Sequence, residues 1–163
     1  MAKIRAEQAL TPSLLDRLID DDPGVQRETP RSRTQVLREL KRSVRRELED
    51  LLNTRRCCLV LPPDLKELER SLVNYGIPDF TGAHVASADS RDELRRTIEE
   101  VIRLHEPRFQ KVTVHLLDSG EPLDRTLRFR IDALLRMHPA PEPIVFDSAL
   151  EPGSGTFEVK AEV

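Results

Sequence analysis

Pro107 divides the chain into two parts with different hydrophobic periods. Before it, from Ser90 onward, apolar residues recur every three or four positions, as in a helix that buries one face. After it, Val112, Val114 and Leu116 alternate with polar residues, as in a half-buried strand. Proline lacks a backbone N–H and disfavours the helical conformation in the residue before it. We therefore expect a helix that ends at about Glu106 and a strand that follows.

A long helix is predicted to begin at Ser32, because Ser32 and Gln35 have the spacing of a capping box. The apolar residues that follow share one face of this helix: Val36, Leu37, Leu40, Val44, Leu48, Leu51 and Leu52. A stripe of basic residues lies beside that face: Arg38, Lys41, Arg42, Arg45 and Arg46. We interpret the basic stripe as a solvated side of the helix.

Two shorter helices are predicted between this helix and the proline. The stretch "LPPDLKELERSLVNYG", residues 61–76, has Gly76 as its expected C-cap. Its apolar face consists of Leu65, Leu68 and Leu72. The other helix opens with a second capping box, Ser90 with Glu93, and presents Leu94, Ile98, Val101 and Ile102.

The second part of the chain is predicted to form a sheet. A turn at "DSGEPLD" joins the strand around Val114 to a second alternating run, residues 127–135, as an antiparallel hairpin. The stretches "PIVFDS" and "GTFEVKA" supply two further short strands. Helices followed by strands indicate an α+β domain, in which N-terminal helices pack on a small three- to four-stranded, mainly antiparallel sheet.

Composition and charge exclude several classes of protein. The 163 residues suffice for one domain with a real core, and a formal net charge of −3 does not favour a nucleic-acid binder. The adjacent Cys57 and Cys58 make a poor structural disulfide, so we expect a reducing compartment and thiols that pack as small apolar groups. No run approaches about 18 apolar residues and no secretory signal is recognisable. We therefore predict a cytoplasmic protein that does not insert into a membrane.

Residues suited to catalysis or metal binding form no recognisable pattern. The histidines have no ligand spacing: His84, His105, His115 and His138. Phosphate-binding glycine loops and nucleophile elbows are absent from the sequence. Glu106 is the one acid in an unusual setting, and Arg108 would favour its ionised form if the two side chains met. We predict no catalytic residue, no metal and no cofactor.

Residues 1–33 are polar and contain prolines, with one apolar cluster at helical spacing in "PSLLDRLID". We predict that they form a flexible N-terminal arm with a short docking segment, followed by a single domain over residues 34–163. The docking residues are Leu14, Leu15, Asp16, Arg17 and Leu18. The alternative is a turn that folds back onto the chain's own core.

Four stretches together resemble the TssE family of type VI secretion baseplate proteins. They are "PSLLDRL", "LEDLLNTRR", "SLVNYGIPDF" and "HEPRF", in that order, and the last is followed by the alternating hairpin. The resemblance extends over about residues 12–160. The TssE family belongs to the wider group of lysozyme-like wedge proteins of contractile phage tails.

This resemblance implies a structural role in a baseplate wedge rather than catalysis. The expected partners are the TssF and TssG subunits, with TssK, the VgrG hub and the TssB–TssC sheath in the assembled machine. The small sheet is similar to the interlocking part of the sheath proteins and would start the sheath by strand addition. Glu106, Pro107 and Arg108 match the family's Glu-Pro-Arg motif and would dock on the helical bundle made by TssF and TssG.

The residues of "HEPRF" are compatible with two roles. Arg108, held at a turn that Pro107 fixes, would offer a planar guanidinium fork to a partner, with Glu106 orienting it. In that case Arg108→Ala would destabilise the isolated domain little. The alternative is a self-contained helix stop with a local ion pair.

The motif "LLNTRR" has the same two interpretations. Asn53 and Thr54 can satisfy the last carbonyls of the long helix and turn the chain. Arg55 and Arg56 follow as cations at a helix C-terminus, where the helix dipole favours them whatever their use. These four residues either bind a partner or only end the helix.

The sequence leaves three rival functions open. A peptidoglycan hydrolase would suit the lysozyme-like label of the wider group, but the sequence places no acid pair and no export signal. A small regulatory adaptor shares the fold group, yet "PSLLDRL" and the complete "LLNTRR" favour the baseplate. Nucleic-acid binding through the basic stripe is the least favoured.

Overall fold

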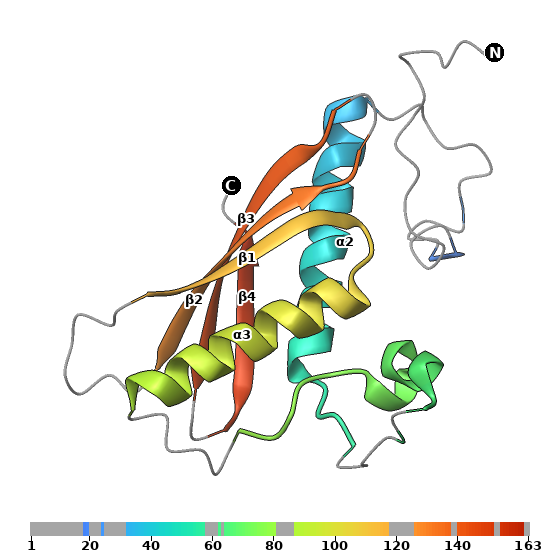
Figure 1. The fold of residues 1–163 in the computed structure, drawn as a ribbon. Helices are drawn as coiled ribbons and strands as arrows, with labels where there is room; N and C mark the ends of the chain where they lie inside the picture. The colour runs from blue at the N-terminus through green and yellow to red at the C-terminus, as the bar shows by residue number, and fades with distance from the viewer. Residues whose placement is uncertain are drawn as a thin grey trace.

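The computed structural model describes residues 18, 19, 24, 32–57, 62, 64–80, 87–117, 126–137, 140–151 and 154–161. Two α-helices, α2 (Arg33–Asn53) and α3 (Ala88–His105), flank two short 3-10 segments, η1 (Lys66–Arg70) and η2 (Leu72–Asn74). Four strands follow: β1 (Phe109–Leu117), β2 (Leu127–Leu135), β3 (Glu142–Glu151) and β4 (Thr156–Ala161). The order of helices and then strands confirms the α+β class (Figure 1).

Helix α2 begins as its sequence predicts. The hydroxyl of Ser32 accepts a hydrogen bond from the Gln35 N–H at 3.3 Å, and the Gln35 side chain accepts one from the Ser32 N–H at 2.8 Å. This capping box satisfies two of the N–H groups that a helix start leaves without partners. The C-terminal half of the predicted apolar face is buried, through Val44, Leu48, Leu51 and Leu52.

Helix α3 ends as predicted but begins earlier. Glu106 caps its C-terminus with an N–H bond to the Ile102 carbonyl at 2.9 Å, directly before Pro107. The N-cap is Ser87, whose hydroxyl accepts from the Ser90 N–H at 3.1 Å, so the predicted capping box of Ser90 with Glu93 is wrong. Two serines three residues apart offer alternative caps, and the earlier one lengthens the helix by most of a turn.

The predicted helix over residues 61–76 is also wrong. Among the described residues of this stretch, only η1 and η2 are helical, and Ser71 between them is extended, with a hydroxyl that accepts from the Val73 N–H at 3.3 Å. A serine that bonds to nearby backbone groups competes with helix formation. As a result Leu65 and Leu72 do not share a buried face, and 87% of Leu72 is exposed.

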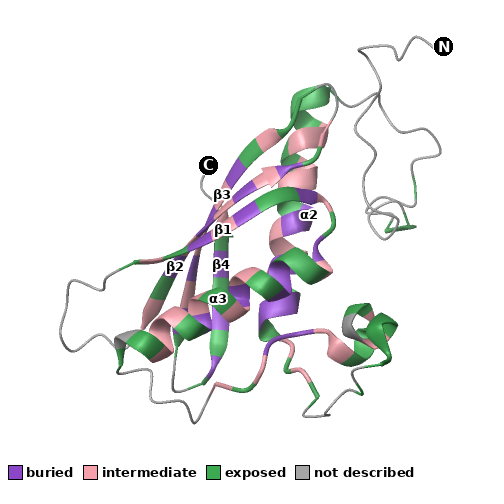
Figure 2. Cartoon of the chain, viewed as in Figure 1, coloured by how far each residue is buried: buried purple, intermediate pink, exposed green. Residues whose placement is uncertain are grey.

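The four strands form one antiparallel sheet in the order β1-β2-β3-β4. Along each strand, buried residues alternate with more accessible ones, so one face of the sheet is covered and the other is open to solvent (Figure 2). Both helices pack on the covered face, α3 on β1 and α2 on β4, around one apolar core. Phe129, Phe146 and Phe157 are the largest side chains buried there.

The basic stripe of α2 is only partly a solvated surface. Lys41 forms an ion pair with Glu142 of β3 at 3.3 Å, and Arg45 donates to the Val159 carbonyl of β4 at 3.0 Å. Arg38 and Arg42 are exposed, as expected. Because these two cations contact β3 and β4, the stripe helps to hold α2 on the sheet.

Gly76 makes a close backbone approach instead of capping a helix. Its φ is +101°, a conformation that side-chain-bearing residues rarely adopt. A Cβ atom at this position would lie 2.4 Å from the Thr54 carbonyl oxygen. The sequence predicted a special role for this glycine, as a helix C-cap. Its actual role is to allow a close contact with the end of α2.

We expect Gly76→Ala to lower the free energy of unfolding by about 2 kcal/mol or more, through backbone strain and the clash with Thr54. Chemical denaturation would measure the loss. Gly76→Asn separates the two causes, because asparagine tolerates positive φ better but carries the same Cβ. A nearly normal stability for the asparagine variant would contradict the close approach.

Candidate functional site

Three sequence motifs meet at one end of the domain: "LLNTRR" (51–56), "NYGIPD" (74–79) and "HEPRF" (105–109). Arg55 and Ile77 form a parallel β-bridge, in which the Ile77 N–H bonds to the Thr54 carbonyl at 2.9 Å and the Arg56 N–H bonds to the Ile77 carbonyl at 2.8 Å. We call these three stretches together the motif junction. It joins the C-terminal ends of α2 and α3 to the sheet.

"LLNTRR" connects α2 to β4. The Asn53 amide donates to the Phe157 carbonyl at 2.9 Å and accepts from the Phe157 N–H at 2.8 Å, as a neighbouring strand would. Arg55 donates to the carbonyls of Gly155 and Leu52. Thr54 satisfies a helix carbonyl, that of Asp50, at 2.7 Å, as expected for a residue that ends the helix, whereas the Asn53 side chain bonds Phe157 of β4 instead of a helix carbonyl.

"NYGIPD" lies against the end of α3. A ring nitrogen of His105 hydrogen-bonds the Asn74 carbonyl at 3.1 Å, and the rings of His105 and Tyr75 meet edge-on at 5.2 Å between centroids. Arg56 donates to the Asn74 side chain at 3.3 Å. Burial raises the pKa of the Tyr75 hydroxyl, and the nearby carboxylates of Asp50, Glu47 and Glu106 raise it further.

"HEPRF" forms an internal ion-pair cluster. Arg108 Nε donates to Glu106 at 2.7 Å, and Arg108 Nη2 lies against both Glu106 and Glu47 of α2. The backbone N–H of Arg108 also bonds Glu106, at 3.1 Å. Glu106 is only 6% exposed, so its charge is stabilised almost entirely by Arg108 and the backbone.

Arg108 is therefore not the freely exposed fork that the partner-binding interpretation assumed. Its side chain is 24% exposed and is held by carboxylates of its own chain. Burial alone would lower the pKa of Arg108, but the hydrogen bond and charge of Glu106, with the charge of Glu47, raise it overall. Of the motif's three residues, only Pro107 is exposed.

The sequence interpretation missed Glu47. Its position gave a signal, since it lies three residues after Val44 and four before Leu51, beside the buried face of α2. A carboxylate there can reach across to a cation on another element. Nothing local in the sequence indicates that this cation is Arg108, 61 positions later.

An accessible surface borders the motif junction. A cleft of about 630 Å³ lies between α3 and the stretch before Phe80. Its lining is both apolar and polar: Arg56, Asn74, Pro78, Phe80, Glu93, Thr97, Glu100, Val101, Leu104 and His105. Leu104 is partly exposed there. The cleft combines apolar walls with polar motif residues, which suits contact with a protein partner.

Two further residues singled out in the sequence, Cys57 and Leu18, are both exposed. Cys57 is exposed, so the expectation that it packs as a small apolar group is wrong, and Cys58 lies outside the described residues. Leu18 is 81% exposed, while the remaining docking residues lie outside the described part of the chain: Leu14, Leu15, Asp16 and Arg17.

Within the described residues there is neither a cluster of metal ligands nor a helix that could span a membrane. Among them, no three His, Cys, Asp or Glu side chains gather where they could hold a metal ion. None of the described helices is both long and apolar enough to span a bilayer.

We expect Arg108→Ala to lower the free energy of unfolding by about 2–3 kcal/mol, because it leaves the buried Glu106 without its cation. Arg108→Lys should recover only part of this, since an ammonium cannot bond both carboxylates with a rigid fork. Urea unfolding of the isolated chain measures both. Arg96→Ala, which breaks an exposed ion pair on α3, is the matched control and should leave stability nearly unchanged. Equal stability of all variants would contradict the structural role of Arg108.

Comparison with known proteins identifies the family of this chain. The family model described as baseplate wedge protein gp25 matches residues 38–140, more than half of the chain. A comparison with curated proteins found no match. The matched region contains all three motifs of the junction and both strands of the β1–β2 hairpin. The chain therefore belongs to the baseplate wedge protein gp25 family.

Proposed function

We propose that this chain is a TssE-type subunit of a type VI secretion baseplate wedge, which binds TssF and TssG and helps to start the contractile sheath. The observation that carries the proposal is the wedge-family match over residues 38–140, a region that contains the whole motif junction. Membership in that family supports a structural role in a baseplate. TssE is the type VI homologue of gp25, and "PSLLDRL" with the complete "LLNTRR" favours TssE among the family's members.

The motif junction suits a docking site because its shape is fixed internally. Glu106 and Arg108 hold the turn from beneath and leave Pro107 exposed at its tip. The adjoining cleft offers apolar contact area beside Arg56. A preformed surface loses little entropy on binding. In this proposal TssF and TssG contact Pro107, the cleft and the end of "LLNTRR", and the ion pairs position those contacts.

The arm provides a second contact in the same proposal. In this proposal residues 1–33, most of which lie outside the described part of the chain, contribute the docking segment, and residues 34–163 form the wedge domain. Leu18 and Ile19 are both exposed, as expected for apolar residues that bind a partner rather than the chain's own core. Assembly with TssK, the VgrG hub and the TssB–TssC sheath places the protein in the cytoplasm, at the inner face of the cytoplasmic membrane.

We expect deletion of residues 1–30 to leave the melting temperature nearly unchanged and to weaken binding to a TssF–TssG complex. Exposed side chains contribute little to the stability of the domain, whereas a docking segment contributes to the interface. Calorimetry of the isolated chain and co-purification with TssF and TssG measure the two effects. Leu18→Ser in the full chain is the matched point variant and should reproduce the weaker binding.

Two outcomes would count against the proposal. A large fall in melting temperature on deletion would show that the arm belongs to the core of the domain. Failure of the full chain to co-purify with TssF and TssG, both folded, would contradict the assignment to a type VI wedge.

A further inference from the structure

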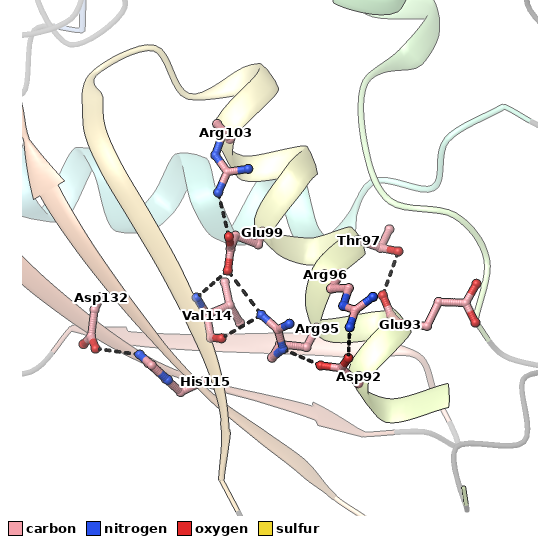
Figure 3. Close-up of polar contacts among 10 residues, drawn as sticks. All are labelled: Asp92, Glu93, Arg95, Arg96, Thr97, Glu99, Arg103, Val114, His115 and Asp132. Atoms are coloured by element: carbon pink, nitrogen blue, oxygen red, sulfur yellow. Dashed lines mark hydrogen bonds and ion pairs between the residues drawn. The ribbon is translucent and has the colours of Figure 1, made fainter. Parts of the chain in front are cut away.

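Helix α3 carries two groups of acidic residues that differ in their partners. In the first group, Asp92 is paired with Arg95 at 2.8 Å and with Arg96 at 2.7 Å (Figure 3). Glu99 is paired with Arg103 at 2.6 Å. All of these partners belong to the same helix, three or four residues away, where side chains are neighbours on the helix surface. These two acids are therefore already occupied within α3.

Glu93 and Glu100 form the second group, which faces the cleft beside the motif junction. Both residues are exposed, and both line the cleft. Figure 3 shows the Glu93 side chain pointing away from Asp92 and its arginines. Among the residues that the structure describes, neither carboxylate has a hydrogen-bonded or ion-paired partner. The α3 wall of the cleft thus carries two negative charges that no described cation pairs with.

The two acids lie on one stripe of α3 that ends in an apolar residue. Positions 93, 97, 100 and 104 follow one another by four, three and four residues, so their side chains share one side of the helix. From the rise of an α-helix, Glu93 and Glu100 are about 10 Å apart along the axis. Leu104 ends the stripe and is 37% exposed, and Phe80 also lines the cleft. A segment in this cleft therefore meets negative charge along α3 and apolar surface near the helix end.

Backbone groups around the cleft are already used within the chain. Those of α3 bond within the helix. On the opposite side, Ile77 bonds Thr54 through its N–H and Arg56 through its carbonyl, and the Asn74 carbonyl is hydrogen-bonded to His105. An extended segment buried there would leave its own backbone groups without partners, whereas a helix satisfies them internally. The form that suits this cleft is therefore a helix.

We propose that the cleft takes an amphipathic helix of the TssF–TssG complex, on which two basic residues seven positions apart pair with Glu93 and Glu100. The inference rests on the proposed function, because it takes that complex as the source of the helix. A helix packed along α3 has the same rise, so cations seven residues apart reach both acids at once. An apolar residue of its docking face lies against Leu104 and Phe80. Neither acid belongs to the four stretches that resemble TssE, so the charge match gives this chain a specificity of its own.

The affinity of the full chain for the purified TssF–TssG complex, measured by interferometry, tests the charge match. Glu93→Gln with Glu100→Gln should weaken binding about fivefold, and Glu93→Lys with Glu100→Lys about fiftyfold, because like charges then face each other. Added salt should weaken binding of the wild type more than that of the glutamine variant. Glu151→Lys with Glu158→Lys is the matched control, with the same charge change on exposed residues of β3 and β4, and should bind as wild type does.

A photo-reactive residue at position 97, between the two acids, identifies the segment that enters the cleft. The cross-linked peptide of TssF or TssG should contain basic residues seven positions apart. A peptide without them, or equal affinities of the wild type and the lysine variant, would overturn the charge-matched helix and leave the proposed function standing. Failure of the wild-type chain to bind TssF–TssG would contradict the proposed function, and the inference with it. Because both acids are exposed, each variant should unfold in urea at the wild-type midpoint, so that a loss of affinity reports on the interface.

Discussion

The bond between Arg108 and the buried carboxylate of Glu106 is the interaction on which the arrangement of this domain depends. Helices α2 and α3 pack mainly on the sheet, α2 beside β4 and α3 beside β1, at opposite sides of the covered face. Arg108 follows α3 directly and reaches Glu47 of α2 as well as Glu106. One guanidinium therefore pairs with two carboxylates from different elements and links the helices at the start of β1.

A second main feature of the structure is that side chains bond to backbone groups of the edge strands, where a neighbouring strand would otherwise bond. Asn53 does this for Phe157, and Glu99 and Arg95 together do it for Val114. A four-stranded sheet of this size has two unprotected edges unless something covers them. Here the helices cover the edges with polar side chains while their apolar faces cover the sheet. Each helix thus contributes apolar side chains to the core and polar side chains that bond to one edge of the sheet.

The sequence predicted those features that arise from local physical chemistry. Pro107 had to end α3, Ser32 and Gln35 had to cap α2, and the alternation around Val114 and Ile131 had to give a hairpin. Features that depend on distant partners were not predictable. Asn53 bonds Phe157, 104 positions later, and no periodicity encodes that pair. The helix over residues 61–76 failed for a different reason, because the spacing of Leu65 and Leu72 resembles a buried face that tertiary packing never covers.

In the candidate site, too, local features were predictable and features that depend on distant partners were not. Its motifs were recognisable, and Pro107 marks the exposed turn, but which members face inward could be seen only in three dimensions. Glu106 and Arg108 are held by their own chain, whereas Pro107, Leu72 and the adjoining cleft are accessible. Some residues of these motifs thus fix the shape of a surface, while others, such as Pro107, form part of the surface itself.

A double-mutant cycle between Glu47 and Arg108 tests the central claim most directly. Free energies of unfolding would be measured for wild type, Glu47→Ala, Arg108→Ala and the double variant. If Arg108 links the two helices through Glu47, the stability losses of the two single variants should add up to about 1 kcal/mol more than the loss of the double variant. Additive effects, within about 0.3 kcal/mol, would contradict the claim that this ion pair joins α2 to the turn after α3.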